Sequence, residues 1–449
     1  MTAHVVRRFP TTTAGTSGWE ALATRTRPVR TLDGDVSADW LIIGGGFAGL
    51  SAARRLSQLR PGERVVLVDA QELAKGPAGR NSGFMIDVPH NLAAGEYSVA
   101  DATATALEIE QNRHAIGFAK EAAAELEMGP DVFDPSGKTN AAATDRGLRL
   151  NRNYAEALER IGEARTVLDA AQMRELTGTS YYRGGLHTPG AVIIQPARYV
   201  HALAAGLPPS VDILENAPVR ELRREAGLWA ARSNAGTVRA PKAIVAVNGL
   251  IEEFGHFRGR LIHIFTYASM TRAFSDASLG GSGTGRDRWA LLPADPMGAT
   301  LRKITEAGGS RLAIRTRFTY DPSLSVSERR LRGVAAEQRR SLDARFPGLA
   351  GIPFEYTWAG NLCLSRNHVP AFGEVEEGLF SACCENGLGT VKSTLAGIMA
   401  AELATGTTSE RLTTYGASPM PSRLPPGPVA RLGISSVIRW QELRAGREG

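Results

Sequence analysis

Short apolar runs and longer amphipathic stretches alternate along the chain. Residues 40–43 (WLII) and 65–68 (VVLV) are uninterrupted apolar runs, as expected for parallel strands that are buried on both faces. Between them, residues 50–59 repeat alanine and leucine at helical spacing, and Pro61-Gly62 would end that helix. The pattern predicts a strand–helix–strand unit near the start of an α/β fold.

The same reading predicts the later elements. Helices are expected over 101–128, 146–163, 169–176, 196–207 and 327–345, and strands over 191–195, 211–216, 219–223, 229–233, 237–239, 244–247, 354–358 and 379–383. Alternating and β-branched segments between residues 261 and 320 predict an antiparallel sheet. The helices after residue 100 are interpreted as a helical insertion. The chain is therefore expected to be an α/β protein with a second domain built on an antiparallel sheet plus helices.

Three glycines between the first strand and the first helix form the pattern G-x-G-x-x-G. Gly44 permits a tight turn, Gly46 lets a diphosphate approach the backbone, and Gly49 lets helix and strand pack closely. The free N–H groups of the helix N-terminus would face that diphosphate. Asp69 ends the second strand, where a carboxylate can accept both ribose hydroxyls and would repel a 2′-phosphate. This context predicts a site for NAD or FAD.

Composition narrows the class of protein. With 449 residues the chain has the length of about two or three domains, and 43% hydrophobic and 22% charged residues are ordinary for a globular protein. No apolar run approaches the ~20 residues of a membrane helix, and no apolar segment follows the first arginines, so neither a membrane span nor a secretory signal is expected. Cys363, Cys383 and Cys384 offer no disulfide framework or metal-ligand spacing, and a cytoplasmic location is the expectation.

The net charge of +6 raises the question of a nucleic-acid partner. Most arginines are scattered, and those crowded into residues 327–346 are interpreted as the solvated face of an amphipathic helix. No nucleic-acid partner is therefore expected, and the positive charge is compatible with an anionic substrate.

Four stretches together resemble the D-amino-acid oxidase-like family of FAD-dependent oxidoreductases, which also contains glycine, sarcosine and γ-glutamylputrescine oxidases. They are the glycine motif with Asp69, residues 79–83 (GRNSG, similar to the family's S-G-R-N-G-G loop with Ser82 in place of a glycine), residues 246–249 (AVNG, similar to A-x-N/A-G) and residues 387–390 (GLGT, similar to G-H-G-x). The resemblance implies a Rossmann-type FAD-binding domain and a substrate domain.

Residues expected to contact FAD follow from these motifs. They are Gly44, Gly46, Phe47, Ala48, Gly49, Asp69, Ala70, Gln71, Gly79, Arg80, Asn81, Ser82, Val219 (through its backbone), Asn248, Gly249, Gly387, Leu388, Gly389 and Thr390. The chain departs from the family in two places. Ser365, Asn367 and Pro370 stand where the family often has T-x-D-x-x-P, and Cys363 is displaced by three residues from the cysteine that attaches FAD in some members. Non-covalent FAD is therefore expected.

The implied reaction is oxidation of the C–N bond of an amine or amino acid, by hydride transfer to flavin N5 and hydrolysis of the imine. The acceptor is expected to be O2, and a quinone or other carrier is the alternative. A non-catalytic flavin-binding protein is a third possibility. The helix that starts near Thr390 would place its positive dipole at flavin N1–O2.

Candidate substrate and catalytic residues lie on the segments expected to form the floor of a pocket over the flavin. His263 and Arg315 are the two chosen as catalytic candidates, because a positive residue there could promote electron transfer to oxygen or pair with a substrate carboxylate. A core histidine and a surface ion-pair residue are the alternatives. Further candidates are His90, Trp289, Arg302, Tyr320 and Lys392.

The expected division of the chain is discontinuous. An FAD-binding domain takes residues 36–95, 186–256 and 350–417, and a substrate domain takes 96–185 and 257–349. An N-terminal arm covers 1–35. A C-terminal extension over 418–449 combines a proline-rich linker with a short terminal helix. The oligomeric state is left open.

Overall fold

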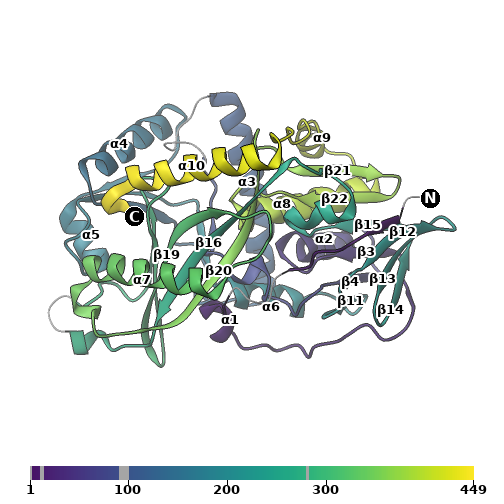
Figure 1. The fold of residues 1–449 in the computed structure, drawn as a ribbon, viewed down its shortest axis with the longest axis horizontal. Helices are drawn as coiled ribbons and strands as arrows, with labels where there is room; N and C mark the ends of the chain where they lie inside the picture. The colour runs from purple at the N-terminus through teal and green to yellow at the C-terminus, as the bar shows by residue number, and fades with distance from the viewer. Residues whose placement is uncertain (1–2, 11–14, 90–100, 280–282) are drawn as a thin grey trace.

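The structure is a computed structural model that describes residues 3–10, 15–89, 101–279 and 283–449. Two large sheets organise the described residues (Figure 1). A mainly parallel sheet with its helices occupies one end of the molecule, and long antiparallel strands covered by other helices occupy the opposite end. The architecture confirms the expected α/β fold with an antiparallel second sheet.

The parallel sheet has six strands among the described residues, in the order β11 (Val211–Leu214), β4 (Val65–Val68), β3 (Trp40–Ile43), β15 (Lys242–Val245), β22 (Leu379–Cys383) and β21 (Ala371–Glu376). The first five strands run parallel, and β21 runs antiparallel to β22. Ile42 and Leu67 pack into one hydrophobic cluster, and Leu41 and Val66 pack into another on the opposite face. Burial on both faces explains why these strands read as continuous apolar runs.

Different layers cover the two faces of this sheet. The helices that contribute to the hydrophobic cluster of one face include α2 (Phe47–Leu59), α3 (Ala102–Glu125), α6 (Pro196–Ala205) and α8 (Gly389–Thr405). The other face packs against a five-stranded sheet in the order β1 (Ala3–Val5), β12 (Glu221–Glu225), β13 (Leu228–Ser233), β14 (Gly236–Ala240) and β2 (Val36–Ser37). Pairing of β1 with β12 holds the start of the N-terminal arm in place.

The second large sheet has eight strands among the described residues. Their order is β20 (Phe354–Ser365), β16 (Leu261–Thr271), β19 (Gly309–Tyr320), β18 (Thr300–Glu306), β17 (Trp289–Pro293), β7 (Lys138–Ala142), β9 (Gly184–Thr188) and β8 (Thr166–Leu168). Leu301 and Ile314 of this sheet share a buried cluster with Leu342 of α7 (Glu328–Arg345). A small sheet of β5 (Phe84–Met85), β10 (Val192–Ile194) and β6 (Phe133–Asp134) is also present.

The helical insertion expected after residue 100 is only partly helical. It contains α3, α4 (Asp145–Arg160) and α5 (Ala170–Thr177), but it also supplies β7 and β8 to the eight-stranded sheet. Short helices outside it are α1 (Gly18–Ala21), α9 (Glu410–Gly416), η1 (Pro77–Gly79), η2 (Asn248–Phe254), η3 (Asp276–Leu279) and η4 (Pro347–Leu349). The domain limits given above stay a prediction, and the limit at residue 95 lies outside the described residues.

The C-terminal extension folds back onto the eight-stranded sheet. Helix α10 (Gly427–Ala445), followed by η5 (Gly446–Glu448), is longer than the short helix expected there, and it lies across the molecule in Figure 1. Glu442 accepts a hydrogen bond from the Phe318 N–H at 2.9 Å, and Glu448 accepts one from the Ala143 N–H at 2.9 Å. None of the described helices combines the length and the apolar character that crossing a membrane requires.

Candidate functional site

One cavity of about 310 Å³ extends from the glycine turn after β3 to the eight-stranded sheet. Sixteen of the residues expected to contact FAD line it, namely Gly44, Gly46, Phe47, Ala48, Asp69, Ala70, Gln71, Arg80, Asn81, Ser82, Val219, Asn248, Gly387, Leu388, Gly389 and Thr390. Motifs that lie more than 300 residues apart in the chain therefore meet at one site.

The glycine turn has the backbone that the motif requires. Gly44 adopts φ +109°, which favours glycine, and a Cβ there would crowd the Ala246 carbonyl. A Cβ on Gly49 would overlap the Gly44 carbonyl oxygen, so this glycine sets the packing of α2 against β3. Gly46 faces open space, where the nearest atom to a Cβ would be the Ala78 Cβ at 3.7 Å. The turn thus leaves room for a ligand at the N-terminus of α2.

Asp69 ends β4 beside this turn. Its carboxylate accepts hydrogen bonds from the Gly45 N–H at 2.6 Å and the Gln71 N–H at 2.8 Å. Burial raises the pKa of Asp69 to about 6, although both hydrogen bonds oppose that shift. A carboxylate has about four acceptor positions, so two remain for ribose hydroxyls.

The N-terminus of α8 faces the same cavity from the other side. Gly387 adopts φ +85° in the turn before the helix, and Thr390 in its first turn donates a hydrogen bond to the Phe84 carbonyl. A Cβ on Gly397 would overlap the Ala48 carbonyl, so α8 and α2 pack in backbone contact, side by side in Figure 1. Two helix N-termini, each with unpaired N–H groups and a positive dipole end, therefore converge on one cavity.

The loop after η1 forms a further wall of the cavity. The Arg80 guanidinium donates to the Lys75 carbonyl at 2.6 Å and to the Gly15 carbonyl at 2.8 Å, and burial lowers its pKa. Trp358 Nε1 donates to the Arg80 carbonyl at 3.0 Å. Arg80 thus joins the N-terminal arm, the loop and β20 into one wall.

The far end of the cavity is mostly apolar. Phe265 and Phe318 of the eight-stranded sheet line it together with Phe9 of the N-terminal arm. Arg315 also lines it, where its guanidinium donates to Thr300 Oγ1 at 2.7 Å and lies 5.0 Å from the centre of the Phe318 ring. A guanidinium at an aromatic ring on the cavity wall is suited to binding an anionic group.

Several predicted residues lie behind the cavity wall. Gly49 and Gly79 pack against backbone, and Gly249 packs against the ring of His263. His263 does not line the cavity, and its Nε2 lies 2.8 Å from Glu252 Oε2 on η2. This position fits a buried histidine that holds η2 in place rather than one that contacts a substrate.

The other candidates are also engaged elsewhere. The Arg302 guanidinium donates to the Ile194 carbonyl at 2.6 Å, and burial lowers its pKa to about 9. Lys392 pairs with Glu108 at 2.7 Å. Trp289 and Tyr320 do not line the cavity. His90 lies outside the described residues.

Two features of the cavity escaped the sequence reading. The N-terminal arm reaches the cavity at Arg8 and Phe9, a contact that no local pattern indicates. Glu385 lines the cavity just before the GLGT turn, and burial raises its pKa. Its Oε1 accepts a hydrogen bond from the Cys363 N–H at 3.0 Å, while Oε2 is buried without a hydrogen bond. The position of Glu385, two residues before the glycine turn, was the sequence feature that could have indicated that it lines the cavity.

The parallel sheet, the glycine turn and the acidic strand end define a dinucleotide-binding protein. Residues 39–403 match the family model for FAD-dependent oxidoreductases. The chain is 26% identical over 413 residues to a probable oxidoreductase OrdL of Rhizobium meliloti, covering 87% of this chain and 89% of that protein. It is 25% identical over 399 residues to γ-glutamylputrescine oxidoreductase of Escherichia coli, with coverages of 87% and 89%.

A solved structure shares the fold. Glycine oxidase from Geobacillus kaustophilus superposes with a TM-score of 0.66 at 19% identity, covering 87% of this chain and 100% of that one. Because the family model matches most of the sequence, this chain belongs to the D-amino-acid oxidase-like family of FAD-dependent oxidoreductases. It is an enzyme, and FAD is its cofactor.

The affinity for FAD is expected to rise with pH through the pKa of Asp69. The free protein holds this carboxyl with a pKa of about 6, whereas ribose hydroxyls donate to the ionised form and lower the pKa in the complex. FAD binding then releases a proton at low pH, and the Kd should fall about tenfold between pH 5 and pH 7. Titration of the FAD-free protein by flavin fluorescence measures this. A flat profile, or an equal slope in Asp69→Asn, would contradict it.

Replacement of Glu385 by glutamine is expected to stabilise the protein at high pH. The pKa of Glu385 is raised in the folded state, so its protonated form contributes stability that is present below the unfolded pKa and lost as pH rises through the folded pKa. Glutamine keeps the acceptor for the Cys363 N–H without the charge. The melting temperature of Glu385→Gln should therefore exceed that of the wild type by more at pH 8 than at pH 5. An advantage that is larger at pH 5 would refute the assignment.

Proposed function

We propose that this enzyme oxidises the C–N bond of a small amine or amino acid, with O2 as the electron acceptor. The observation that carries the proposal is the single cavity, in which the two helix ends of the nucleotide site continue into an aromatic end with Arg315. Two relatives named above, a γ-glutamylputrescine oxidoreductase and a glycine oxidase, support the substrate class.

Bound FAD would supply the hydride acceptor of the reaction. The residues fit it, because the turn at Gly46 leaves room for a diphosphate and Asp69 keeps free acceptor positions for the ribose. The N–H groups at Gly389 and Thr390 begin α8 and present its positive end to negative charge. Cys363 is buried and does not line the cavity, which supports non-covalent FAD.

The aromatic end would prepare the substrate. Phe265 and Phe318 exclude water, and an ammonium group brought against them loses solvation, so its pKa falls and the reactive neutral amine becomes available. A dedicated general base is then unnecessary. Arg315 would hold a substrate carboxylate and fix the orientation of the amine-bearing carbon.

We place the enzyme in the cytoplasm, a location supported by its three cysteines, which are all free and buried.

Arg315→Leu is expected to raise KM for substrates that carry a carboxylate and to leave KM nearly unchanged for amines that lack one. Loss of a charge-assisted hydrogen bond of about 1.5–3 kcal/mol should raise KM about tenfold to a hundredfold for an amino acid. KM for the matching amine without a carboxylate should stay within about twofold, because that amine never used the guanidinium. Steady-state kinetics on such a substrate pair measure this. Equal losses for both substrates would show that Arg315 only supports the wall, and Arg315→Lys should restore part of the selectivity.

The electron acceptor is tested by oxygen uptake. An oxidase consumes one O2 and releases one hydrogen peroxide for each amine oxidised. Uptake that keeps pace with product formation would support the proposal. Turnover that requires an added quinone or dye, with no peroxide, would instead identify a dehydrogenase.

A further inference from the structure

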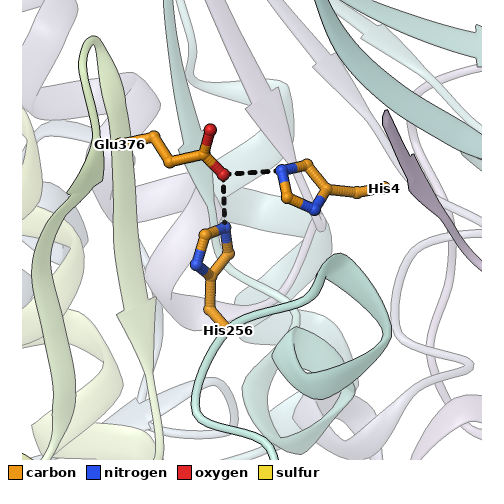
Figure 2. A group of neighbouring side chains, drawn as sticks. All are labelled: His4, His256 and Glu376. Atoms are coloured by element: carbon orange, nitrogen blue, oxygen red, sulfur yellow. Dashed lines mark hydrogen bonds and ion pairs between the residues drawn. The ribbon is translucent and has the colours of Figure 1, made fainter. Parts of the chain in front are cut away.

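Three side chains from distant parts of the chain converge outside the cavity (Figure 2). His4 lies on β1, His256 follows η2, and Glu376 ends β21. His4 Nε2 lies 2.6 Å and His256 Nε2 lies 3.3 Å from the same oxygen, Glu376 Oε1, and the three atoms lie within 4.8 Å of one another. None of the three residues lines the cavity, so the reaction described above does not account for them.

Hydrogen bonding alone leaves this cluster incomplete. His4 Nε2 forms a hydrogen bond with Glu376 Oε1, whereas the buried His256 Nε2 lies 3.3 Å from the same oxygen without forming a hydrogen bond. A buried polar atom without a hydrogen bond costs about 1–3 kcal/mol. A cation shared by the three atoms would satisfy both imidazoles and the carboxylate together.

We propose that His4 Nε2, His256 Nε2 and Glu376 Oε1 bind a divalent transition metal of the zinc class. Two imidazoles and a carboxylate form a donor set that zinc takes, and Zn–N and Zn–O bonds of about 2.0–2.1 Å place neighbouring tetrahedral donors roughly 3.3 Å apart. The His256–Glu376 distance already has that value, and the His4–Glu376 distance must open from 2.6 Å. The side chain of Glu376 is 34% exposed, so water can reach the fourth position.

None of the three ligands lines the cavity, so the metal would hold the N-terminal arm in place rather than contact the substrate there. His4 is 8% exposed, its ring is stacked on Trp229 with the ring centres 6.5 Å apart, and its strand pairs with β12, so its orientation is fixed before metal binds. A few residues later, Arg8 and Phe9 of the same arm line the cavity, and Arg8 pairs with Glu253 of η2 at 2.6 Å. A metal bound to His4 would therefore stabilise the position of the N-terminal arm, which lines one side of the cavity.

Zinc binding tests the site. Full-length protein without a histidine tag is stripped with a chelator and titrated calorimetrically with zinc, and with cobalt, whose visible absorption reports tetrahedral nitrogen and oxygen ligands. One metal per chain is expected, and both His256→Ala and Glu376→Gln should weaken binding about tenfold or more. The control His187→Ala, a histidine on β9 of the other sheet, should bind as the wild type does. Absence of binding, or equal binding by all variants, overturns the proposal.

Amide hydrogen exchange tests whether the metal stabilises the N-terminal arm. Zinc should slow amide exchange at residues 3–10 in the wild type and leave it unchanged in Glu376→Gln. The Glu376 side chain is partly exposed, so the substitution should be tolerated. An FAD content equal to that of the wild type checks that the variant is folded. Metal binding without slower exchange would overturn the role in holding the arm. Neither result depends on which amine is oxidised, so the outcome is separate from that of the proposed function.

Discussion

Replacing Gly46 by aspartate is expected to abolish FAD binding in a chain that still folds. Gly46 is the N-cap of α2 with φ −84° and ψ −167°, an extended backbone that any residue adopts, and a new Cβ would have 3.7 Å to its nearest neighbour. Aspartate is a favourable N-cap, so the helix gains a cap. Its charge, however, would stand where the diphosphate binds. Like charges 4 Å apart repel by about 4 kcal/mol at an effective dielectric constant of 20, about a thousandfold in Kd.

Gly46→Asn is the matched control for this substitution. Asparagine caps the helix equally well and has nearly the same volume, but it carries no charge. Flavin fluorescence titration gives the Kd of each variant, and circular dichroism with thermal melting establishes that the FAD-free chains are folded. The aspartate variant should bind FAD far more weakly than the asparagine variant. Wild-type affinity in both variants would show that no negatively charged ligand group lies at the start of α2.

Gly397→Val is expected to lower both stability and FAD affinity, although Gly397 lies in no recognised motif. Its Cβ would overlap the Ala48 carbonyl and lie 3.0 Å from the Ala52 nitrogen, so α8 must move away from α2. Overpacking of this kind costs about 3 kcal/mol, which for 449 residues corresponds to a fall of about 3 °C in melting temperature. The same movement separates the two helix ends at the cavity, so the Kd for FAD should rise more than tenfold.

The control for this variant is another glycine inside a helix. Gly117 lies within α3, and a Cβ there would meet nothing within 4 Å. Gly117→Val should leave stability within about 0.5 kcal/mol of the wild type, because valine and glycine differ little in helix propensity. Thermal melting with and without FAD compares the two variants. A Gly397→Val protein that melts like Gly117→Val would contradict the backbone contact between α2 and α8.

The sequence was most informative where a pattern has a local physical cause. Strands β3 and β4 are buried on both faces, so their apolar runs identified them directly. The left-handed backbone at Gly44 and the packing of Gly49 against the Gly44 carbonyl arise within the turn itself, as the motif predicted. Local causes of this kind also located both glycine turns of the cavity.

Elements whose stability comes from distant partners were missed or misplaced. Strand β7 reads KTNAA and its first three side chains are polar and buried, so hydrophobic patterning could not find it. Lys138 Nζ donates a hydrogen bond to Asn140 Oδ1 at 2.6 Å. Helices α10 and η5 are held by contacts of Glu442 and Glu448, respectively, with residues more than 100 positions away. His263 was chosen from its strand, but which side of the cavity wall it occupies is decided by Glu252 and Gly249.

Anaerobic reduction of the purified protein tests the central claim most directly. The account predicts a yellow protein whose flavin absorbance near 450 nm, roughly the position expected of oxidised FAD, is bleached by an amine or amino acid without any other reagent. Bleaching should be complete when one molecule of substrate has been added per FAD, and the Gly46→Asp protein should be colourless. A colourless wild-type protein, or a flavin that no member of a broad panel of amines and amino acids reduces, would contradict the account.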